Sequence, residues 1–250
     1  MSLIADVFDV ILVDNDGEVI GTTTLTEANI DVTVQENDVR GGKGNQLLGI
    51  LHSDRDIAIN LTDAEFKYSW LAKQFGQDII TESGVAWAMP KWYEAVDDMG
   101  EVTITLDNTP LTEDSNLKIY DVSGAEIAET TGYTINENII TLVDGAEGDR
   151  VEVRTYKYNT DESTKVIEID NSIFAKGVQC ILETLEITGE EEPVATIQYQ
   201  FEKALPSGNF TASTASERTA QAQAFNLRVI KPDNSTKVGK VLRIPIAEAN

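Results

Sequence analysis

One segment decides the predicted fold: Thr62 to Gly76, which reads TDAEFKYSWLAKQFG. Its apolar side chains recur three and four residues apart, the spacing of one face of an α-helix. We predict a single helix over about residues 62–75, with Thr62 and Glu65 as a capping box and Gly76 as the left-handed residue that ends it. We expect four side chains to pack this helix against a sheet: Phe66, Trp70, Leu71 and Phe75.

The residues before the helix predict strands and turns. A dense β pattern over 3–13 is followed by Asn15-Asp16-Gly17, whose residues favour a tight turn because they tolerate positive φ. Three further strands are predicted at 30–34, 47–51 and 57–61. A basic, glycine-rich loop precedes the second of these and consists of Arg40, Gly41, Gly42, Lys43, Gly44 and Asn45. We expect this loop to order on assembly against a neighbouring subunit or ring; the alternative is a mobile hairpin loop.

The middle of the chain predicts a separate domain. Asp97 and Asp98 followed by Gly100 mark a boundary. Short strands separated by turn residues from Glu101 to Asn159 favour a small Ig-like sandwich. From Lys165 onward the earlier strand pattern resumes. We therefore predict a mainly β protein, with a β-sandwich or barrel core of residues 1–98 and 161–250, one flanking helix, and an inserted Ig-like β domain over residues 99–160.

Composition limits the function. The 250 residues include 43 acidic and 19 basic side chains, a formal net charge of -24. Such a surface repels nucleic acid and anionic membranes, so a DNA-gripping or membrane-binding role is disfavoured. No apolar run is long enough to span a bilayer, and the first residues lack the pattern of a secretory signal. The single cysteine, Cys180, excludes an internal disulfide and indicates folding in a reducing cytoplasm; it shares an apolar strand face with Val178 and Leu182.

Catalytic patterns are weak. His52 is the single histidine, and Asp54 and Asp56 follow it closely. A solvated turn explains this short cluster better than a metal or acid–base site. Gly41-Gly42-Lys43-Gly44 lacks the spacing of a phosphate-binding P-loop. We predict no catalytic residue, no metal site, no cofactor and no enzymatic activity.

Three segments together resemble a known family. They are DVRGGKGNQLLGILHSDRD from Asp38 to Asp56, FEKALPSGNFT from Phe201 to Thr211, and FNLRVIKPDNS from Phe225 to Ser235. Their order around the amphipathic helix is similar to that of major tail tube proteins of long-tailed bacteriophages. The resemblance covers the two flanking parts of the chain and not the middle.

The resemblance implies a structural virion protein. Members of the family form β-sandwiches with one flanking helix; six copies make a ring whose inner strands join into a barrel, and the rings stack into a hollow tube. The implied partners are further copies of the chain, the tape-measure protein and other tail proteins, with genomic DNA passing through the lumen without specific binding. The implied location is the virion tail, after synthesis in the host bacterial cytoplasm. The middle domain would decorate the outside of the tube, which favours a non-contractile tail.

Two alternatives stay open beside this hypothesis. The first is a virion- or cell-surface adhesin or carbohydrate-binding module, with the inserted domain gripping its ligand. The second is a β-sandwich hydrolase, for which no converging set of acid–base groups is visible in the sequence. The tail tube hypothesis predicts rings or tubes, the adhesin hypothesis predicts a monomer or small oligomer that binds a ligand, and the hydrolase hypothesis predicts a catalytic pocket.

Overall fold

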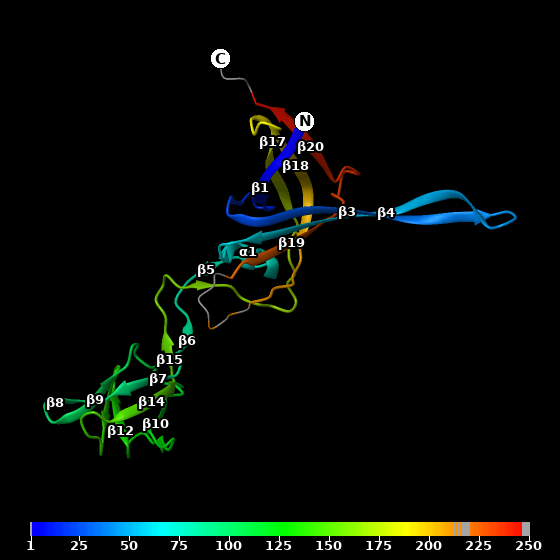
Figure 1. Ribbon diagram of the computed structural model, residues 1–250. Helices are drawn as coiled ribbons and strands as arrows, with labels where there is room; N and C mark the ends of the chain where they lie inside the picture. The colour runs from blue at the N-terminus through cyan, green and yellow to red at the C-terminus, as the bar shows by residue number, and fades with distance from the viewer. Residues whose placement is uncertain (1, 213, 215, 217–220, 247–250) are drawn as a thin grey trace. The chain divides into compact units, whose positions relative to one another are not determined.

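A computed structural model describes residues 2–212, 214, 216 and 221–246. The chain divides into two compact units (Figure 1). Unit 1 comprises Met1–Ile79 and Ile167–Asn250, and unit 2 comprises Ile80–Val166. Unit 2 is therefore an insertion in the chain of unit 1. Both units are built mainly of β-strands, so the predicted mainly β fold is confirmed.

Unit 1 contains one large antiparallel sheet. Its strands follow the order β2-β1-β17-β18-β19-β4-β3, and β20 pairs with β18 beside this path. Strand β18 is long enough to pair with β20 through its first half and with β19 through its last residues. The strands are β1 (Ser2–Val13), β2 (Val19–Thr22), β3 (Leu25–Gly41), β4 (Gln46–Asp63), β17 (Val178–Thr188), β18 (Pro193–Pro206), β19 (Gln223–Val229) and β20 (Gly239–Pro245).

The core of unit 1 follows the period of two that strands impose. In β17, Val178, Cys180 and Leu182 are buried while Gln179 and Glu183 are exposed, so the predicted shared face of the first three is confirmed. Burial raises the pKa of the Cys180 thiol to about 12. The same core includes these buried side chains: Val10, Leu12, Ile59, Leu61, Trp70, Phe225 and Leu227.

The helix is shorter than predicted. Helix α1 spans Tyr68–Phe75, and the capping box of Thr62 and Glu65 is wrong. Thr62 lies at the end of β4, where it pairs with Ala224 of β19. Thr62 and Asp63 therefore belong to strand β4, although the local sequence predicts them to be helical, because pairing with β19 satisfies their backbone hydrogen-bonding groups.

A side chain distant in the sequence, Gln223, binds the backbone at the beginning of the helix instead. The Gln223 amide oxygen accepts a hydrogen bond from the backbone N–H of Lys67 at 2.6 Å, and its amide nitrogen donates to the Lys67 carbonyl at 3.3 Å. Gly76 ends the helix in the left-handed conformation with φ +71°, as predicted. A side chain there would also collide with the carbonyl oxygen of Phe174, 2.2 Å from an ideal Cβ position. Within the described residues, α1 is too short to cross a membrane, and no longer helix is present.

The apolar side chains of the predicted helix have different fates. Trp70 is fully buried and packs on Phe225, with ring centroids 4.9 Å apart. Leu71 and Phe75 are partly buried, and the rings of Phe75 and Phe210 lie edge to face with their centroids 6.3 Å apart. Phe66 lies before α1 and is 51% exposed. The helix therefore packs on the sheet mainly through Trp70.

Unit 2 consists mainly of two four-stranded sheets, β11-β10-β14-β7 and β12-β13-β9-β8. Residues from both sheets share one apolar core, which includes Ile104, Ile119, Ile140 and Val153. The strands of unit 2 are β5 (Ile80–Thr81), β6 (Val85–Trp87), β7 (Lys91–Glu94), β8 (Val96–Asp98), β9 (Glu101–Thr105), β10 (Lys118–Tyr120), β11 (Glu126–Ile127), β12 (Tyr133–Asn136), β13 (Ile139–Leu142), β14 (Arg150–Thr155), β15 (Lys157–Asn159) and β16 (Lys165–Val166).

Unit 2 begins earlier in the chain than the sequence pattern suggested. The acidic turn expected as a boundary is the hairpin between β8 and β9, where Asp98 pairs with Glu101 and the N–H of Gly100 donates to Asp97. Strand β7 also belongs to this unit, since it pairs with β14. The chain passes into and out of unit 2 through a paired β5 and β16, in which Ile80 lies opposite Val166.

This pairing predicts that unit 2 can be removed. Replacing residues 82–164 by Asn-Gly joins Thr81 and Lys165, which are register partners, by a two-residue hairpin turn. We expect the shortened chain to keep a cooperative thermal transition, because the core of unit 1 contains no residue of unit 2. Circular dichroism and calorimetry would measure it. Loss of the transition would show that unit 1 depends on unit 2 for folding.

Candidate assembly interface

The longest hairpin of unit 1 extends beyond its core. Strands β3 and β4 pair from Leu25 to the tip at Gly41, but β19 covers β4 only as far as Ala58. Beyond that point the described strands pair only with each other, and Figure 1 shows the hairpin reaching away from the rest of unit 1. We call residues 34–55 the arm.

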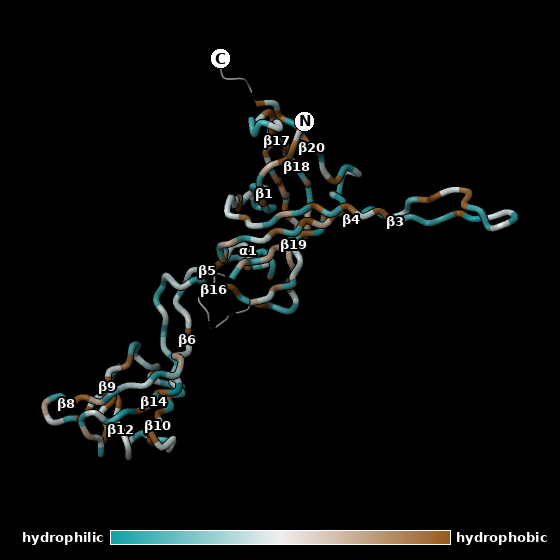
Figure 2. Tube along the Cα trace, in the orientation of Figure 1, coloured by the Kyte–Doolittle hydropathy of each residue, from teal (hydrophilic) through white to brown (hydrophobic). Residues whose placement is uncertain are grey.

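The arm exposes large aliphatic side chains. Leu48 is 67% exposed and Leu51 is 62% exposed, and the hydrophobic segments along the arm are visible in Figure 2. A two-stranded hairpin is marginally stable by itself, and clustered exposed apolar residues mark interaction surfaces. The exposed aliphatic residues of the arm are Val34, Val39, Leu47, Leu48, Ile50 and Leu51.

The glycine-rich segment forms the tip of the arm. Gly41 ends β3, and the backbone N–H of Asn45 donates to the carbonyl of Gly42 at 3.2 Å to close a tight turn. Gly42, Gly44 and Asn45 all have positive φ, which explains the glycines. Arg40 forms an exposed ion pair with Asp38 at 2.6 Å. Lys43 stands in the turn itself, so the tip carries two cations on a strongly acidic protein.

His52 also lies in the arm. Its Nδ1 is 3.6 Å from the Glu36 carboxylate directly opposite on β3, and both side chains are exposed. Asp56 forms an ion pair with Arg228 at 2.6 Å and not with His52. Among the described residues, no group of three or more His, Cys, Asp or Glu side chains is arranged to hold a metal ion.

Two sheet edges are unpaired within the described residues. Strand β2 covers β1 only from Val10 to Val13, so the outer edge of the first half of β1 is open. That half contains a bulge, with Asp6 at φ +67° and a register shift between Ala5 and Asp9. Strand β20 pairs with β18 on one side and with no described strand on the other. Open edges present backbone donors and acceptors to a further strand.

The sheet face opposite the core mixes polar and aliphatic side chains between these edges. Asp9, Glu183, Gln198 and Leu242 lie opposite one another in one cross-strand row. The Gln198 amide donates to Glu183 at 2.9 Å and accepts a hydrogen bond from Gln200. The neighbouring row carries Ile11, Ile181, Gln200 and Lys240.

A buried carboxylate fixes the base of the arm's hairpin. Asp63, the last residue of β4, is fully buried and accepts hydrogen bonds from the hydroxyls of Thr22 and Thr24, both at 2.7 Å. It also accepts from the backbone N–H of Glu65 at 2.9 Å and lies 3.1 Å from the Lys67 ammonium. Burial by itself raises the pKa of Asp63, but the hydrogen bonds from Thr22, Glu65, Thr24 and Lys67 outweigh it and hold the pKa below its usual value.

A second charged contact ties the helix to the first hairpin. The Lys73 ammonium, mostly buried, lies 2.8 Å from Asp14 and 2.9 Å from Glu18, on either side of the predicted Asn15-Asp16-Gly17 turn. Burial lowers the pKa of Lys73, and its hydrogen bonds to Asp14 and Glu18 outweigh this and raise it. The turn itself is confirmed, with the Gly17 N–H donating to the Asp14 carbonyl and φ +84° at Gly17.

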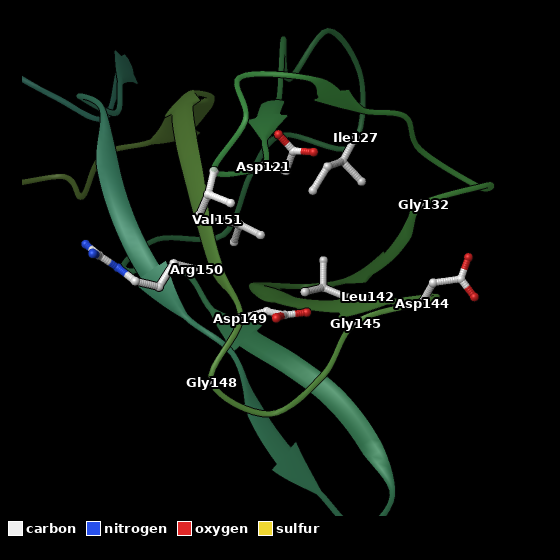
Figure 3. Close-up of a pocket in the computed structure, with 11 residues that line it drawn as sticks. Asp121, Ile127, Gly132, Leu142, Asp144, Gly145, Gly148, Asp149, Arg150 and Val151 are labelled. Carbon is white, nitrogen blue, oxygen red and sulfur yellow. The ribbon is translucent and has the colours of Figure 1, made fainter.

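Unit 2 contains a cavity of about 500 Å³. Figure 3 shows Ile127, Leu142 and Val151 converging on it while Arg150 points away. Of the carboxylates at its margin, Asp121 and Asp149 already accept backbone N–H groups of their own turns. Asp144 and Arg150 lie on different sides of the opening. The cavity therefore brings together no nucleophile and base.

The chain matches a known protein family over most of its length. The sequence model described as the YomU/Tube protein family matches residues 2–244. The chain belongs to the YomU/Tube protein family. The match to this family spans both units. A tail tube protein of Bacillus phage SPR is 28% identical over 202 residues, which cover 80% of this chain and 72% of that protein.

The sequence pattern indicates the loop at the tip of the arm but not the long hairpin behind it. It predicts strands only at 30–34, 47–51 and 57–61, whereas β3 and β4 run without interruption over Leu25–Gly41 and Gln46–Asp63. The signal was present in the unusual density of aliphatic residues at Leu47, Leu48, Ile50 and Leu51 beside a glycine-rich turn. The contribution of Gln223 had no local signal, because it acts on Lys67 from 156 residues away.

The Asp63 contacts predict a large and pH-dependent loss on substitution. We expect Asp63→Asn to lower the free energy of unfolding by about 1–3 kcal/mol at pH 7, because it leaves Lys67 without its buried anion. The pKa of Asp63 is lowered by folding, so its stabilisation is complete above about pH 4 and is lost as the pH falls through the lowered pKa. Denaturant titrations of both proteins between pH 7 and pH 3 measure this difference.

The matched control is Asp56→Asn in the same strand. Asp56 forms an exposed pair with Arg228 at 2.6 Å, and such pairs contribute about 0–1 kcal/mol. Equal losses in the two variants, or a loss at Asp63 that does not shrink at acid pH, would contradict the role assigned to the buried carboxylate.

Proposed function

We propose that this chain is the structural subunit of a bacteriophage tail tube, which self-assembles into stacked rings, hexameric as the family resemblance implies. Membership of the YomU/Tube family carries the proposal, with support from the relative in Bacillus phage SPR. The role needs no catalytic group. Its location is the virion tail, after synthesis in the cytoplasm of the host bacterium.

The open sheet edges supply a route to ring closure. Strands β1, β17, β18 and β20 are each antiparallel to the next, so β1 and β20 run in opposite directions. The outer edge of β20 in one copy can therefore pair antiparallel with the open half of β1 in the next copy. Repetition around a ring extends the four strands into a continuous barrel in which no edge is left open.

The face of these strands that lies opposite the core then lines the lumen. Carboxylates at Asp9 and Glu183 repel DNA phosphates, and the glutamines add neutral hydrogen-bonding groups. Each basic side chain on this face would add affinity for DNA through counterion release. The cross-strand row of Ile11, Ile181 and Gln200 contains one such side chain, Lys240, at its β20 end. Genomic DNA passes through such a lumen without specific binding, and the tape-measure protein is a further partner of the tube.

The arm joins successive subunits or rings. Its aliphatic side chains are exposed in the single chain and its tip, Arg40–Asn45, carries the cations that a neighbouring acidic surface attracts. Other tail proteins meet the same surfaces at the two ends of the tube.

Unit 2 decorates the outside of the tube in this proposal. An insertion that leaves and rejoins unit 1 at one paired point can be carried without interrupting the barrel. The chain shortened at residues 82–164 should therefore still form tubes. A domain in this position leaves little room for a sheath and favours a non-contractile tail; a sheath gene beside this one would count against it.

Charge on the open edge should prevent ring closure. We expect Val241→Lys, at an exposed position of β20, to give a folded monomer without rings, because a lysine there disfavours pairing with a further strand. Negative-stain electron microscopy at high concentration, with light scattering for mass, compares it with the unsubstituted chain. Val122→Lys, at an exposed position in unit 2, is the control and should assemble normally. Rings formed by the Val241 variant would reject this edge.

Shortening the arm should separate folding from stacking. Replacing residues 35–54 by Asn-Gly joins Val34 to its register partner Arg55. We expect the thermal transition to change little, because the removed residues pair only with one another among the described strands, and we expect stacked tubes to be lost. Electron microscopy and calorimetry measure both. Tubes as long as those of the full chain would remove the arm from the proposed interface.

A further inference from the structure

The most exposed aromatic side chain of the described residues in unit 1 lies in the loop that leads into β17. Phe174 is 79% exposed, and Ile169 and Ile173 beside it are also exposed. We call residues 168–174 the Phe174 loop. It lies outside the strands assigned above to ring closure and the lumen.

The backbone of the Phe174 loop is held in place. The Asp170 carboxylate accepts from the backbone N–H of Ser172 at 2.7 Å and from its hydroxyl at 2.6 Å, and the Ile173 N–H donates to the Asp170 carbonyl. The Phe174 carbonyl sits against Gly76 at the end of α1, where only a glycine leaves room for it. The loop therefore presents its aromatic ring outward from a fixed backbone, which lowers the entropy cost of docking.

The surroundings of the Phe174 loop are acidic. Glu168 and Asp170 belong to the loop. Asp78, two residues after Gly76, has most of its side chain exposed and lies 3.6 Å from the mostly buried Lys73 ammonium. Lys176 is a further cation close by in the sequence. An apolar surface with these carboxylates complements the arm, which combines exposed aliphatic side chains with Arg40 and Lys43 at its tip.

We propose that the Phe174 loop is the docking surface for the arm of a second copy of this chain. The inference rests on the proposed tube function and names the surface that receives the arm. The arm extends away from its own unit 1, so the contact joins two copies (Figure 1). Because the two surfaces differ, the contact is head-to-tail and can repeat from subunit to subunit.

Another exposed aromatic pair fits the arm less well. Phe66 and Tyr68 contact each other edge to face at 5.3 Å, so each ring already covers part of the other. This pair serves as the comparison surface in the test.

The test is photocrosslinking in the assembled full-length protein. Phe174 is replaced by the photoreactive analogue benzoylphenylalanine, tubes are formed from the purified chain or recovered in tails of phage particles, and the irradiated sample is digested with trypsin. We expect a covalent link between the peptide containing position 174 and the arm peptide Gly44–Arg55, which contains Leu47–Leu51. The link should be lost in dilute unassembled protein.

Each outcome decides something different. Tubes in which position 174 links to another peptide, or to none, overturn the inference and leave the proposed function intact. The same holds if benzoylphenylalanine at position 66 captures Gly44–Arg55 and position 174 does not. A link that persists in dilute unassembled protein would be intramolecular and would also overturn it. If the purified chain forms no tubes and the chain is also absent from the tails of phage particles, the proposed function is overturned, and this inference with it.

Discussion

The buried carboxylate of Asp63 is the contact on which the layout of unit 1 depends. It receives hydrogen bonds from Thr22 at the end of β2, from Thr24 in the loop that follows, and from Glu65 and Lys67 in the segment leading to α1. A buried anion is stable only when such donors surround it, so these three segments must meet at one point. The end of β4 is thereby fixed, and the direction of the long β3–β4 hairpin at its other end follows from it.

The strand β4 shows how one element serves two environments. Its residues Ile59 and Leu61 are buried in the core, whereas Leu48 and Leu51 remain exposed in the arm. The first pair gains stability within one chain. The second pair stays exposed in the single chain, and the proposed assembly would bury it against another copy. Folding and the proposed assembly would then use different halves of the same strand.

Sequence reasoning succeeded where structure is decided locally. The turn before Gly17, the left-handed Gly76 and the alternation around Cys180 are local features, and all three are found. The beginning of α1 was missed because pairing of Thr62 with β19 overrides helical preference. Only residues 47–51 of the arm's outer part are predicted as a strand, because neither face of the arm is buried by its own chain, which removes the regular alternation that marks a strand. The Asp97–Gly100 turn resembled a domain boundary but is a hairpin inside unit 2.

The burial of Cys180 makes the chain unusually convenient for site-specific labelling. It is the single thiol in the sequence, and its complete burial, which also raises its pKa, keeps it out of contact with thiol reagents in the folded protein. A cysteine introduced on the arm or on unit 2 is therefore the sole reactive position. Fluorophores or spin labels placed in this way can report distances between subunits without first removing a native residue from the core.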